Sequence, residues 1–286
     1  MGKPNKLSQI AHTISYRVFG DVFTTKLQYF RQRKKWPNFE SPRDLSERLL
    51  SARVSSSFDQ YAIYADKVLV RDYVDSKGLG HLLLKHFGVW DRPQDIDFES
   101  LPEKFILKAN NGCGNHIICT DKSKLDKQAA IATLEHSLQL GRTSYERHYR
   151  AIEPKILCEE LLETEDGSPI TDYKIQCIQG EPDHFFVATE RGENTKYCTL
   201  DFDWNEAPYT KQNYKPSYIP QKPQKIAQLV EYARILSKDF ECVRVDFYEH
   251  NGKIYFGELT FSPWGGYMYS YTDDAIKVLG AKFSDK

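Results

Sequence analysis

Two strand-like segments near the C-terminal end of the chain are joined by a turn, and each segment carries one acidic residue. Residues 242–248 and 253–261 are rich in Val, Ile, Phe and Tyr, which favour β-strands. The intervening His250-Asn251-Gly252 suits a tight turn, so the pattern predicts a β-hairpin. Asp246 and Glu258 would then lie on neighbouring strands.

This pair of acids indicates a cation site. If Asp246 and Glu258 share a face of the hairpin, their carboxylates repel each other in a partly dry cleft, and a divalent cation relieves the repulsion. Mg²⁺ prefers oxygen ligands and commonly keeps phosphate oxygens in its remaining positions. The hairpin therefore predicts a metal–nucleotide site. An ordinary exposed hairpin whose acids point into water is the alternative that this segment alone leaves open.

A glycine-containing loop lies between two apolar runs in the middle of the chain. The stretch 105–118 begins with an apolar run that includes Lys108, passes through Asn110-Asn111-Gly112-Cys113-Gly114, and ends in a second apolar run. This order predicts strand, flexible loop, strand. Glycine lets successive backbone N–H groups approach phosphate oxygens, while a lysine supplies a positive charge. The spacing matches neither the P-loop nor the dinucleotide fingerprint, and a plain hairpin turn is the alternative.

A third pair of strands is predicted between these two features. Residues 156–162 are apolar except for Glu159 and Glu160, and residues 171–178 alternate polar and apolar side chains. The alternation places Asp172 and Lys174 on one face of a strand.

Taken in order, these residues resemble the ATP-grasp superfamily, and most closely its TupA-like family of bacterial surface-polysaccharide gene clusters, over about residues 40–265. The resemblance rests on Lys67, Lys108 with its glycine loop, the run 159–162, Asp172 with Lys174, Arg244-x-Asp246 and Glu258. It implies an α+β fold in which two subdomains clamp ATP. We expect a mainly helical N-terminal region at 1–95, a lid subdomain at 96–155 and a C-terminal subdomain with the metal site at 156–286.

The resemblance also assigns nucleotide-binding roles. Lys108 is similar to the lysine that reaches the α- and β-phosphates, and Lys67 to an earlier lysine near the nucleotide. Gly112 and Gly114 would shape the loop over the phosphates. The hinge strand, whose backbone pairs with the adenine edge, corresponds to Glu159, Glu160, Leu161 and Leu162. Asp172 matches a ribose-binding acid.

The implied metal and catalytic residues lie near the hairpin. Asp246 and Glu258 resemble magnesium ligands, and Thr260 stands where many relatives have a third ligand, an asparagine. Lys174 would face phosphate, and Arg244 would stabilise charge during acyl transfer. The loop also departs from the His-Gly-Ser-Gly expected from relatives, although its glycines are kept.

These assignments imply an ATP-dependent carboxylate–amine ligase that uses Mg²⁺ and joins a saccharide or small-molecule carboxylate to an amine, such as an amino acid, in surface-polysaccharide (capsule or teichuronopeptide-like) synthesis. Three alternatives stay open. The triplet Asp201-Phe202-Asp203 occurs in metal-dependent glycosyltransferases, although a turn at a strand end also explains it. An ATP-grasp kinase phosphorylating a sugar hydroxyl, or a binding module without activity, would use the same scaffold.

Composition agrees with a cytoplasmic enzyme. The 286 residues, 40% of them hydrophobic, can bury a sizeable core, and a net charge of −1 argues against nucleic acid as a main partner. The six cysteines form no C-x-x-C pair, which favours reduced core thiols over zinc or disulfides. Cys113, in the predicted phosphate loop, is expected to be a small filler.

The N-terminus combines basic residues with an apolar helical pattern. Apolar residues recur at helical spacing at Leu7, Ile10, Ala11, Ile14, Val18 and Val22, and the basic residues are Lys3, Lys6, Arg17, Lys26, Arg31, Arg33, Lys34 and Lys35. We favour a helix docked on the protein itself, and peripheral contact with anionic lipid is the alternative. No segment is apolar enough to span a bilayer or to form a signal peptide.

Other elements are expected from periodicity. Residues 59–90 are predicted to be helical with a break at Gly78-Leu79-Gly80, and 91–103 to be a linker. A second helix is predicted at 124–140, with Leu125, Ala129, Ile131, Leu134 and Leu138 on its apolar face. Residues 204–222 lack periodicity and are expected to be a connector or a substrate loop.

Overall fold

The chain forms two compact units, each built from separated stretches of sequence. The computed structural model describes residues 6–112, 114–164, 170–189 and 195–283, and side chains from residue 19 onward. The first unit contains Met1–Phe58, Asp172–Val245 and Thr260–Lys286, and the second contains Asp59–Thr171 and Asp246–Leu259. These units cut across the predicted boundaries at residues 95 and 155, because the N-terminal helices belong with the C-terminal half of the chain.

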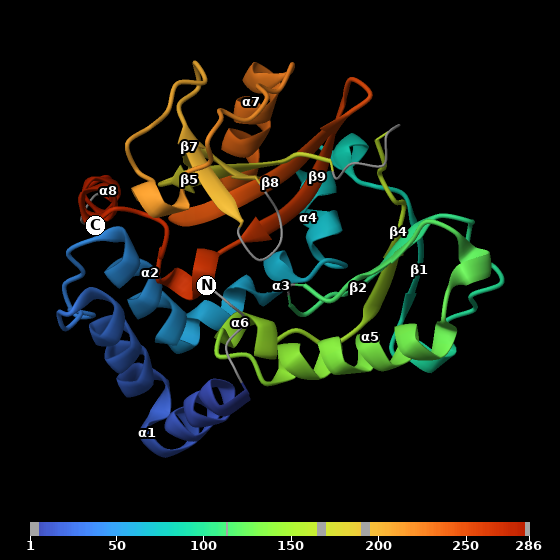
Figure 1. The fold of residues 1–286 in the computed structure, drawn as a ribbon, viewed down its shortest axis with the longest axis horizontal. Helices are drawn as coiled ribbons and strands as arrows, with labels where there is room; N and C mark the ends of the chain where they lie inside the picture. The colour runs from blue at the N-terminus through green and yellow to red at the C-terminus, as the bar shows by residue number, and fades with distance from the viewer. Residues whose placement is uncertain (1–5, 113, 165–169, 190–194, 284–286) are drawn as a thin grey trace. The chain divides into compact units, whose positions relative to one another are not determined.

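The described part of the first unit contains four helices and a β-sheet, and the first of these helices is kinked at Gly20, whose φ is 75°. Its helices are α1 (Lys6–Arg33), α2 (Leu45–Val54), α7 (Ile226–Ser237) and α8 (Asp273–Gly280), with 3₁₀ turns at Gln212–Tyr214 and Pro263–Gly266. Its strands are β5 (Asp172–Ile178), β6 (Glu181–Thr189) and β7 (Lys196–Leu200). Strands β8 (Cys242–His250) and β9 (Lys253–Thr260) have residues in both units. The described strands are ordered β7-β6-β5-β8-β9, and Figure 1 labels β7, β5, β8 and β9.

Local sequence explains why these elements begin where they do. Helix α2 starts at Asp44, whose side chain accepts the N–H of Glu47, and α8 starts at Thr272, whose hydroxyl accepts the N–H of Ala275. Between β8 and β9, Asn251 and Gly252 have φ values of 49° and 67°. Two consecutive positive φ values are those of a type I′ turn, so the predicted hairpin is confirmed.

One core of the first unit lies where α2 and α8 pack together. Its fully or nearly buried members are Leu45, Leu49, Ile178, Phe186, Met268, Tyr271, Ala275, Ile276, Leu279 and Phe283. A smaller cluster joins Tyr29 of α1, Leu50 of α2 and Tyr267. Helix α1 is thus tied to this unit through Tyr29. Of the apolar face predicted to dock, Leu7, Ile10, Ala11, Ile14 and Val18 lie outside the described side chains, and Val22 is 46% exposed.

The second unit is a small helix-covered sheet. Its helices are α3 (Ala62–Ala65), α4 (Val70–Ser76), α5 (Lys127–Arg142) and α6 (Arg147–Arg150), with 3₁₀ turns at Gly80–Leu82, Pro93–Asp95 and Lys122–Lys124. A further 3₁₀ turn, Ser56–Tyr61, spans the boundary between the units. The strands are β1 (His86–Trp90), β2 (Phe105–Ala109), β3 (Ile117–Cys119) and β4 (Ile156–Glu159), in the order β1-β4-β2-β3. Helix α5 packs against β2 and β3.

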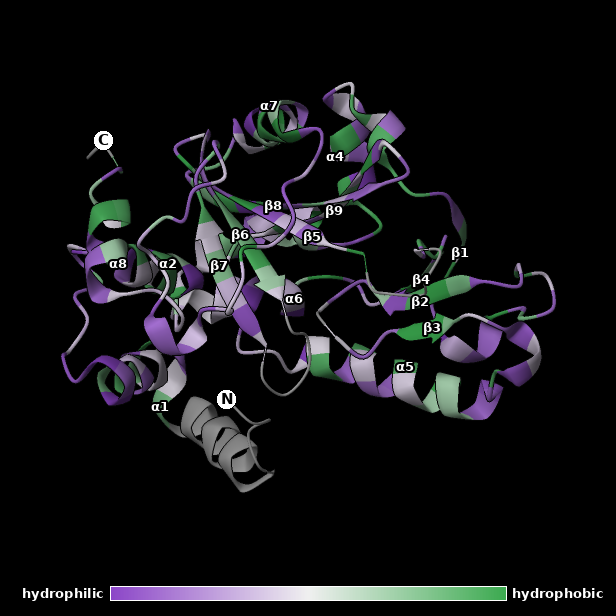
Figure 2. Cartoon of the chain, turned by 45° about the horizontal axis from the view of Figure 1, so that its top comes forward, coloured by the Kyte–Doolittle hydropathy of each residue, from purple (hydrophilic) through white to green (hydrophobic). Residues whose placement is uncertain are grey.

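The core of this unit forms between the sheet and α5. Its buried residues are Ile96, Phe98, Leu101, Phe105, Leu107, Ala109, Cys119, Leu134, Leu138, Ile156 and Cys158. Figure 2 shows the hydrophobic colouring of β2, β3 and β4 beside an α5 of mixed character. This packing fixes β2 and β4, the strands that carry Lys108 and Glu159.

Several predicted elements differ from the observed ones. The helical pattern of 59–90 is broken already at Asp66–Leu69 and ends in strand β1, because β1 pairs with β4. The strand predicted at 156–162 ends at Glu159. In α5 the buried face contains Ala130, whereas Ala129 is exposed.

A search of the described helices found none whose length and apolar content would let it cross a membrane.

Candidate functional site

Lys108 lies on β2 and is held by a buried acid on the neighbouring strand. Strands β2 and β4 are antiparallel, with Lys108 opposite Leu157 and Ile106 opposite Glu159. The Lys108 Nζ lies 2.9 Å from a Glu159 oxygen, and the side chains are only 18% and 11% exposed. Because little water screens it, this pair is stronger than a surface ion pair.

Arg71 of α4 shares the same carboxylate. Its guanidinium lies 3.2 Å from the other oxygen of Glu159, and it also donates to the carbonyl of Leu84 at 2.8 Å. If Lys108 turned toward another anion, Glu159 would still be paired with Arg71. Arg71 was not predicted as a site residue, since nothing in its sequence surroundings distinguishes it from a surface arginine.

The glycine loop is anchored by two asparagines, both with 0% exposure. Asn110 donates to a carboxylate oxygen of Asp66 and to the carbonyl of Glu153, both at 3.0 Å. It also accepts the N–H of Lys155 at 2.7 Å. Each polar group of this amide is thus satisfied, which fixes the N-terminal end of the loop.

The second anchor joins the loop to helix α5. Asn111 donates to the carbonyl of Leu138 at 3.1 Å. A Cβ at Gly141 would lie 2.2 Å from the Asn111 side chain, so only glycine allows this approach. Further along the loop, Gly114 has φ 78°, a conformation that favours glycine. Cys113 lies outside the described residues.

Lys67 contacts this loop. It lies in the turn between α3 and α4, where Asp66 accepts the N–H of Val68 at 2.7 Å. The Lys67 ammonium donates to the carbonyl of Gly112, and its backbone N–H lies 3.5 Å from the Asn110 carbonyl. Burial raises the pKa of Asp66, although its hydrogen bonds oppose the rise. The structure thus brings Lys67 to the predicted phosphate loop, and Asp66 and Asn110 were missed because both resemble ordinary turn residues.

The segment predicted as the hinge, residues 159–162, begins at the last residue of β4 and then leaves the strand. The backbone N–H of Glu160 donates to the carbonyl of Lys85 at 2.9 Å, and Leu161 and Leu162 are half-buried outside any strand. The carboxylate of Glu159 pairs with cations. The adenine-binding role of this segment stays a prediction, and the N–H of Glu160 is already engaged.

In the first unit, two pairs of predicted residues contact each other. Asp172, 6% exposed, forms an ion pair with Lys174 two residues along β5, as the strand alternation predicted. Arg244 donates to the Thr260 hydroxyl at 3.0 Å.

The two predicted magnesium ligands belong to the second unit. Asp246 is 1% exposed on β8, and Glu258 is half-buried on β9. A Cβ at Gly257 would lie 3.0 Å from the Asp246 carbonyl oxygen, so these strands approach closely there.

The burial pattern along β9 changes phase beside these acids. Ile254 and Phe256 are buried, and the next buried core residues are Leu259 and Phe261. Thr260 between them is also buried, so the strict alternation along β9 ends after Phe256. Groups of three or more His, Cys, Asp or Glu side chains suited to a metal are absent from the described residues. A magnesium site completed by phosphate oxygens needs only one or two carboxylates.

The predicted site residues are divided between the two units. Lys67, Lys108, Gly112, Gly114, Glu159, Glu160, Leu161, Leu162, Asp246 and Glu258 belong to the second unit, and Asp172, Lys174, Arg244 and Thr260 belong to the first. Their convergence on one nucleotide stays a prediction.

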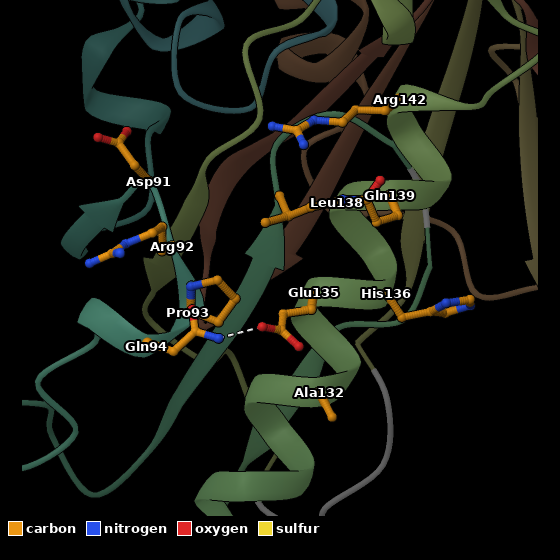
Figure 3. A pocket seen from close by; sticks show the side chains of 10 residues that line it. All are labelled: Asp91, Arg92, Pro93, Gln94, Ala132, Glu135, His136, Leu138, Gln139 and Arg142. Atoms are coloured by element: carbon orange, nitrogen blue, oxygen red, sulfur yellow. Dashed lines mark hydrogen bonds between the residues drawn. The ribbon is translucent and has the colours of Figure 1, made fainter.

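A hollow of about 590 Å³ in the second unit contains none of these residues. Figure 3 shows its lining side chains, from the segment 91–94 and from α5, with Gln94 bonded to Glu135. Its lining mixes acids, bases and amides and gives no chemical reason to place the nucleotide there.

The Asp201-Phe202-Asp203 triplet forms a turn. A single Asp201 oxygen accepts the N–H groups of Asp203 and Asn205, at 3.0 and 2.7 Å. These bonds, led by that of Asn205, lower the pKa of Asp201. The geometry favours the turn explanation.

The cysteines within the described residues are free thiols, namely Cys119, Cys158, Cys177, Cys198 and Cys242. Burial raises the pKa of Cys158 and Cys177 to about 12 and that of Cys198 to about 11. These thiols stay protonated near neutral pH, which agrees with the predicted structural role.

Comparison with known proteins identifies the class. A family model described as TupA-like ATPgrasp matches residues 44–284. The protein has the α+β ATP-grasp fold, as predicted. The chain belongs to the TupA-like ATP-grasp family.

Among solved structures, similar chains include two D-alanine–D-alanine ligases. The enzyme from Bacillus anthracis, complexed with ATP, is 13% identical over 70% of this chain and 56% of its own, with a TM-score of 0.44. That from Helicobacter pylori is 14% identical over 77% and 59%, with a TM-score of 0.43. The D-cycloserine synthetase DcsG is 13% identical over 77% and 69%, with a TM-score of 0.45. The chain thus spans little more than half the length of the first two. No curated protein matches the sequence.

Proposed function

We propose that this protein is an ATP-dependent carboxylate–amine ligase that acts in the cytoplasm on a bacterial surface-polysaccharide precursor, with a uronic acid and an amino acid as the expected classes of substrate. The observation that carries the proposal is the family match over residues 44–284, which includes every predicted site residue. The grouping of Lys67, Lys108 and an anchored glycine loop in one unit supports it.

The residues present suit ATP and magnesium. Asp246, Glu258 and Thr260 offer the hard oxygen atoms that Mg²⁺ prefers, and the bound ion would neutralise phosphate charge. Lys108 and Lys67 would hold phosphate oxygens. Asp172 would bind the ribose, and Lys174 would bind a phosphate in competition with Asp172, its present partner.

The proposed reaction has two steps. A carboxylate oxygen of the acid attacks the γ-phosphorus of ATP, the bond to the β-phosphate bridging oxygen breaks, and ADP leaves. The amine nitrogen then attacks the acyl carbon, inorganic phosphate leaves, and the nitrogen loses a proton to give the amide. Arg244 would stabilise the oxyanion of the second step, for which one donor is typically worth about 3 kcal/mol.

The test is a screen of uronic acids against amino acids and amines, with ADP release and product mass as readouts. We expect one ADP and one phosphate for each amide formed. A stable phosphorylated product without amide would show a kinase. ATP binding without ADP release under any mixture would contradict both activities.

Replacing either predicted magnesium ligand should stop turnover. We expect Asp246→Asn and Glu258→Gln to lower kcat at least about 100-fold, because each change removes a charged ligand, with partial recovery at raised Mg²⁺. The control is Glu103→Gln, an exposed acid of the same unit. Near-normal ADP release by either variant would show that the metal assignment is wrong.

A further inference from the structure

Helix α1 has an inner side that is docked within the first unit. Thr25 and Tyr29 have 0% exposure. The Arg53 guanidinium donates to the Thr25 hydroxyl at 2.7 Å, and Gln28 donates to the Tyr269 hydroxyl at 3.1 Å. These contacts fix the direction in which the opposite side of the helix faces.

The outer side of α1 is apolar and aromatic. Phe19, Val22 and Phe23 are 60%, 46% and 46% exposed, and the rings of Phe19 and Phe23 lie 5.5 Å apart. Two turns after Phe23, the half-buried Phe30 stacks at 4.9 Å on Trp36, which follows the helix and is 51% exposed. Figure 2 shows hydrophobic and hydrophilic residues mixed along the described part of α1. These aromatic rings form an exposed stripe.

Basic residues border this stripe. Arg31 and Lys34 are exposed, whereas Lys26 is half-buried with its ammonium 5.2 Å from the centre of the Phe39 ring, and in the described part of the chain no ion pair links these three residues to an acid. Arg33 and Lys35, by contrast, are paired with Asp273 and Asp44. The outer side therefore carries uncompensated positive charge beside exposed aromatic rings.

We infer that the outer side of α1 rests on an anionic lipid surface. Aromatic and aliphatic side chains enter the headgroup boundary, while lysine and arginine contact lipid phosphates. The charge favours lipid over a second copy of this chain, because a symmetric pair of such faces would bring like charges together. This surface is independent of the proposed ligase activity.

The experiment is co-sedimentation of the full chain with phosphatidylcholine vesicles, with and without phosphatidylglycerol. Deleting residues 1–35 would also remove Tyr29 and Arg33, which make inner contacts, so surface substitutions are used instead. The test variants are Val22→Ser/Phe23→Ser and Arg31→Glu/Lys34→Glu. Matched controls are Tyr218→Ser/Ile219→Ser, at similar exposure, and Lys238→Glu/Lys253→Glu.

We expect binding only to vesicles with phosphatidylglycerol, and about a tenfold or greater loss of partition coefficient in each test variant but in neither control. Binding by the unsubstituted chain should also fall as salt rises, a measurement that does not depend on how the variants fold. Three outcomes would overturn the inference. The unsubstituted chain binds no vesicles, it binds neutral vesicles as strongly as anionic ones, or a test variant binds anionic vesicles as strongly as the unsubstituted chain. The inference is also overturned if light scattering finds a dimer that Val22→Ser/Phe23→Ser dissociates.

Discussion

Glu159 acts as a shared partner for two cations within one unit. Lys108 and Arg71 occupy its two oxygens at 2.9 and 3.2 Å. Transfer of Lys108 to a phosphate would leave Glu159 paired with Arg71, so no buried carboxylate becomes unpaired in the process. The arrangement lowers the cost of using Lys108 as a phosphate ligand.

Lys108→Ala should weaken ATP binding about tenfold or more, since a hydrogen bond to a charged group contributes about 1.5–3 kcal/mol. Calorimetric titration with Mg-ATP measures the change. Lys104→Ala is the control, because Lys104 is exposed and pairs with Glu163. An unchanged Kd would exclude Lys108 from the nucleotide site.

The contact between Asp66 and Asn110 couples Lys67 to the glycine loop. Asp66→Asn places two amide groups against each other, and Asn110→Asp places two carboxylates against each other. We expect each single change to lower the free energy of unfolding. The double variant should lose less than the sum of the two single losses, and the difference, the coupling free energy, should be about 1–2 kcal/mol. Urea unfolding of the four proteins measures it, and strict additivity would show that the contact contributes nothing.

Among the elements, α1, α2 and the turn at Pro263–Gly266 are joined by one buried arginine. Arg53 of α2 has 0% exposure, donates to the carbonyl of Gly265 at 2.5 Å and to Thr25, and lies 5.1 Å from the centre of the Tyr267 ring. The buried guanidinium charge of Arg53 has lost its contact with water, and these partners compensate for that loss.

Arg53→Met should therefore lower the free energy of unfolding by about 2–4 kcal/mol, because the carbonyl of Gly265 and the hydroxyl of Thr25 lose their donor. The measurement is urea unfolding followed by tryptophan fluorescence. Arg31→Met, on the exposed side of α1, should change the stability by less than about 0.5 kcal/mol. Equal stability of the two variants would contradict this role of Arg53.

For the molecule as a whole, the first unit depends on contacts between distant parts of the chain. Asp183 at β6 accepts a hydrogen bond from His184 at 2.8 Å and pairs with Lys282 near the C-terminal end. The other nitrogen of His184 lies 2.7 Å from the Tyr271 hydroxyl. Burial alone would raise the pKa of Asp183, but His184 and Lys282 outweigh it and hold the pKa below its ordinary value.

A depressed folded-state pKa makes this stabilisation sensitive to acid. The stabilisation by ionised Asp183 is fully present above the pKa of this carboxyl in the unfolded chain, about 4. It is lost as the pH falls through the lower pKa that the carboxyl has in the folded protein. Asp183→Asn should be about 1–2 kcal/mol less stable at pH 7, with the difference shrinking below pH 4. Urea unfolding across pH tests this, with the exposed Asp203→Asn as control. A difference that does not vary with pH would contradict the linkage.

Local patterns were sufficient for several elements and contacts. Asn251-Gly252 predicted the hairpin because few residue pairs accept two positive φ values. Alternation at 171–178 predicted that Asp172 and Lys174 share a face, and the two meet. The order of charged residues and glycines was enough to indicate the ATP-grasp family.

Other features depended on partners far along the chain. Nothing near Arg71 predicts that it shares Glu159 with Lys108, since they meet only when α4, β2 and β4 assemble. Residues 1–58 join a unit formed mostly by the C-terminal half.

Turn chemistry, alternation and the order of charged residues are short-range properties, so the amino-acid order already specifies the hairpin, the anchored loop's glycines and the family. The partners of buried charges depend on long-range packing, because burying an ionic group requires partners that only the assembled fold supplies. The sequence therefore named Lys108, Glu159 and Asp246 as candidate site residues, whose roles stay predictions, whereas the contacts of Arg71, Asn110 and the buried side of α1 emerged only once the chain was folded.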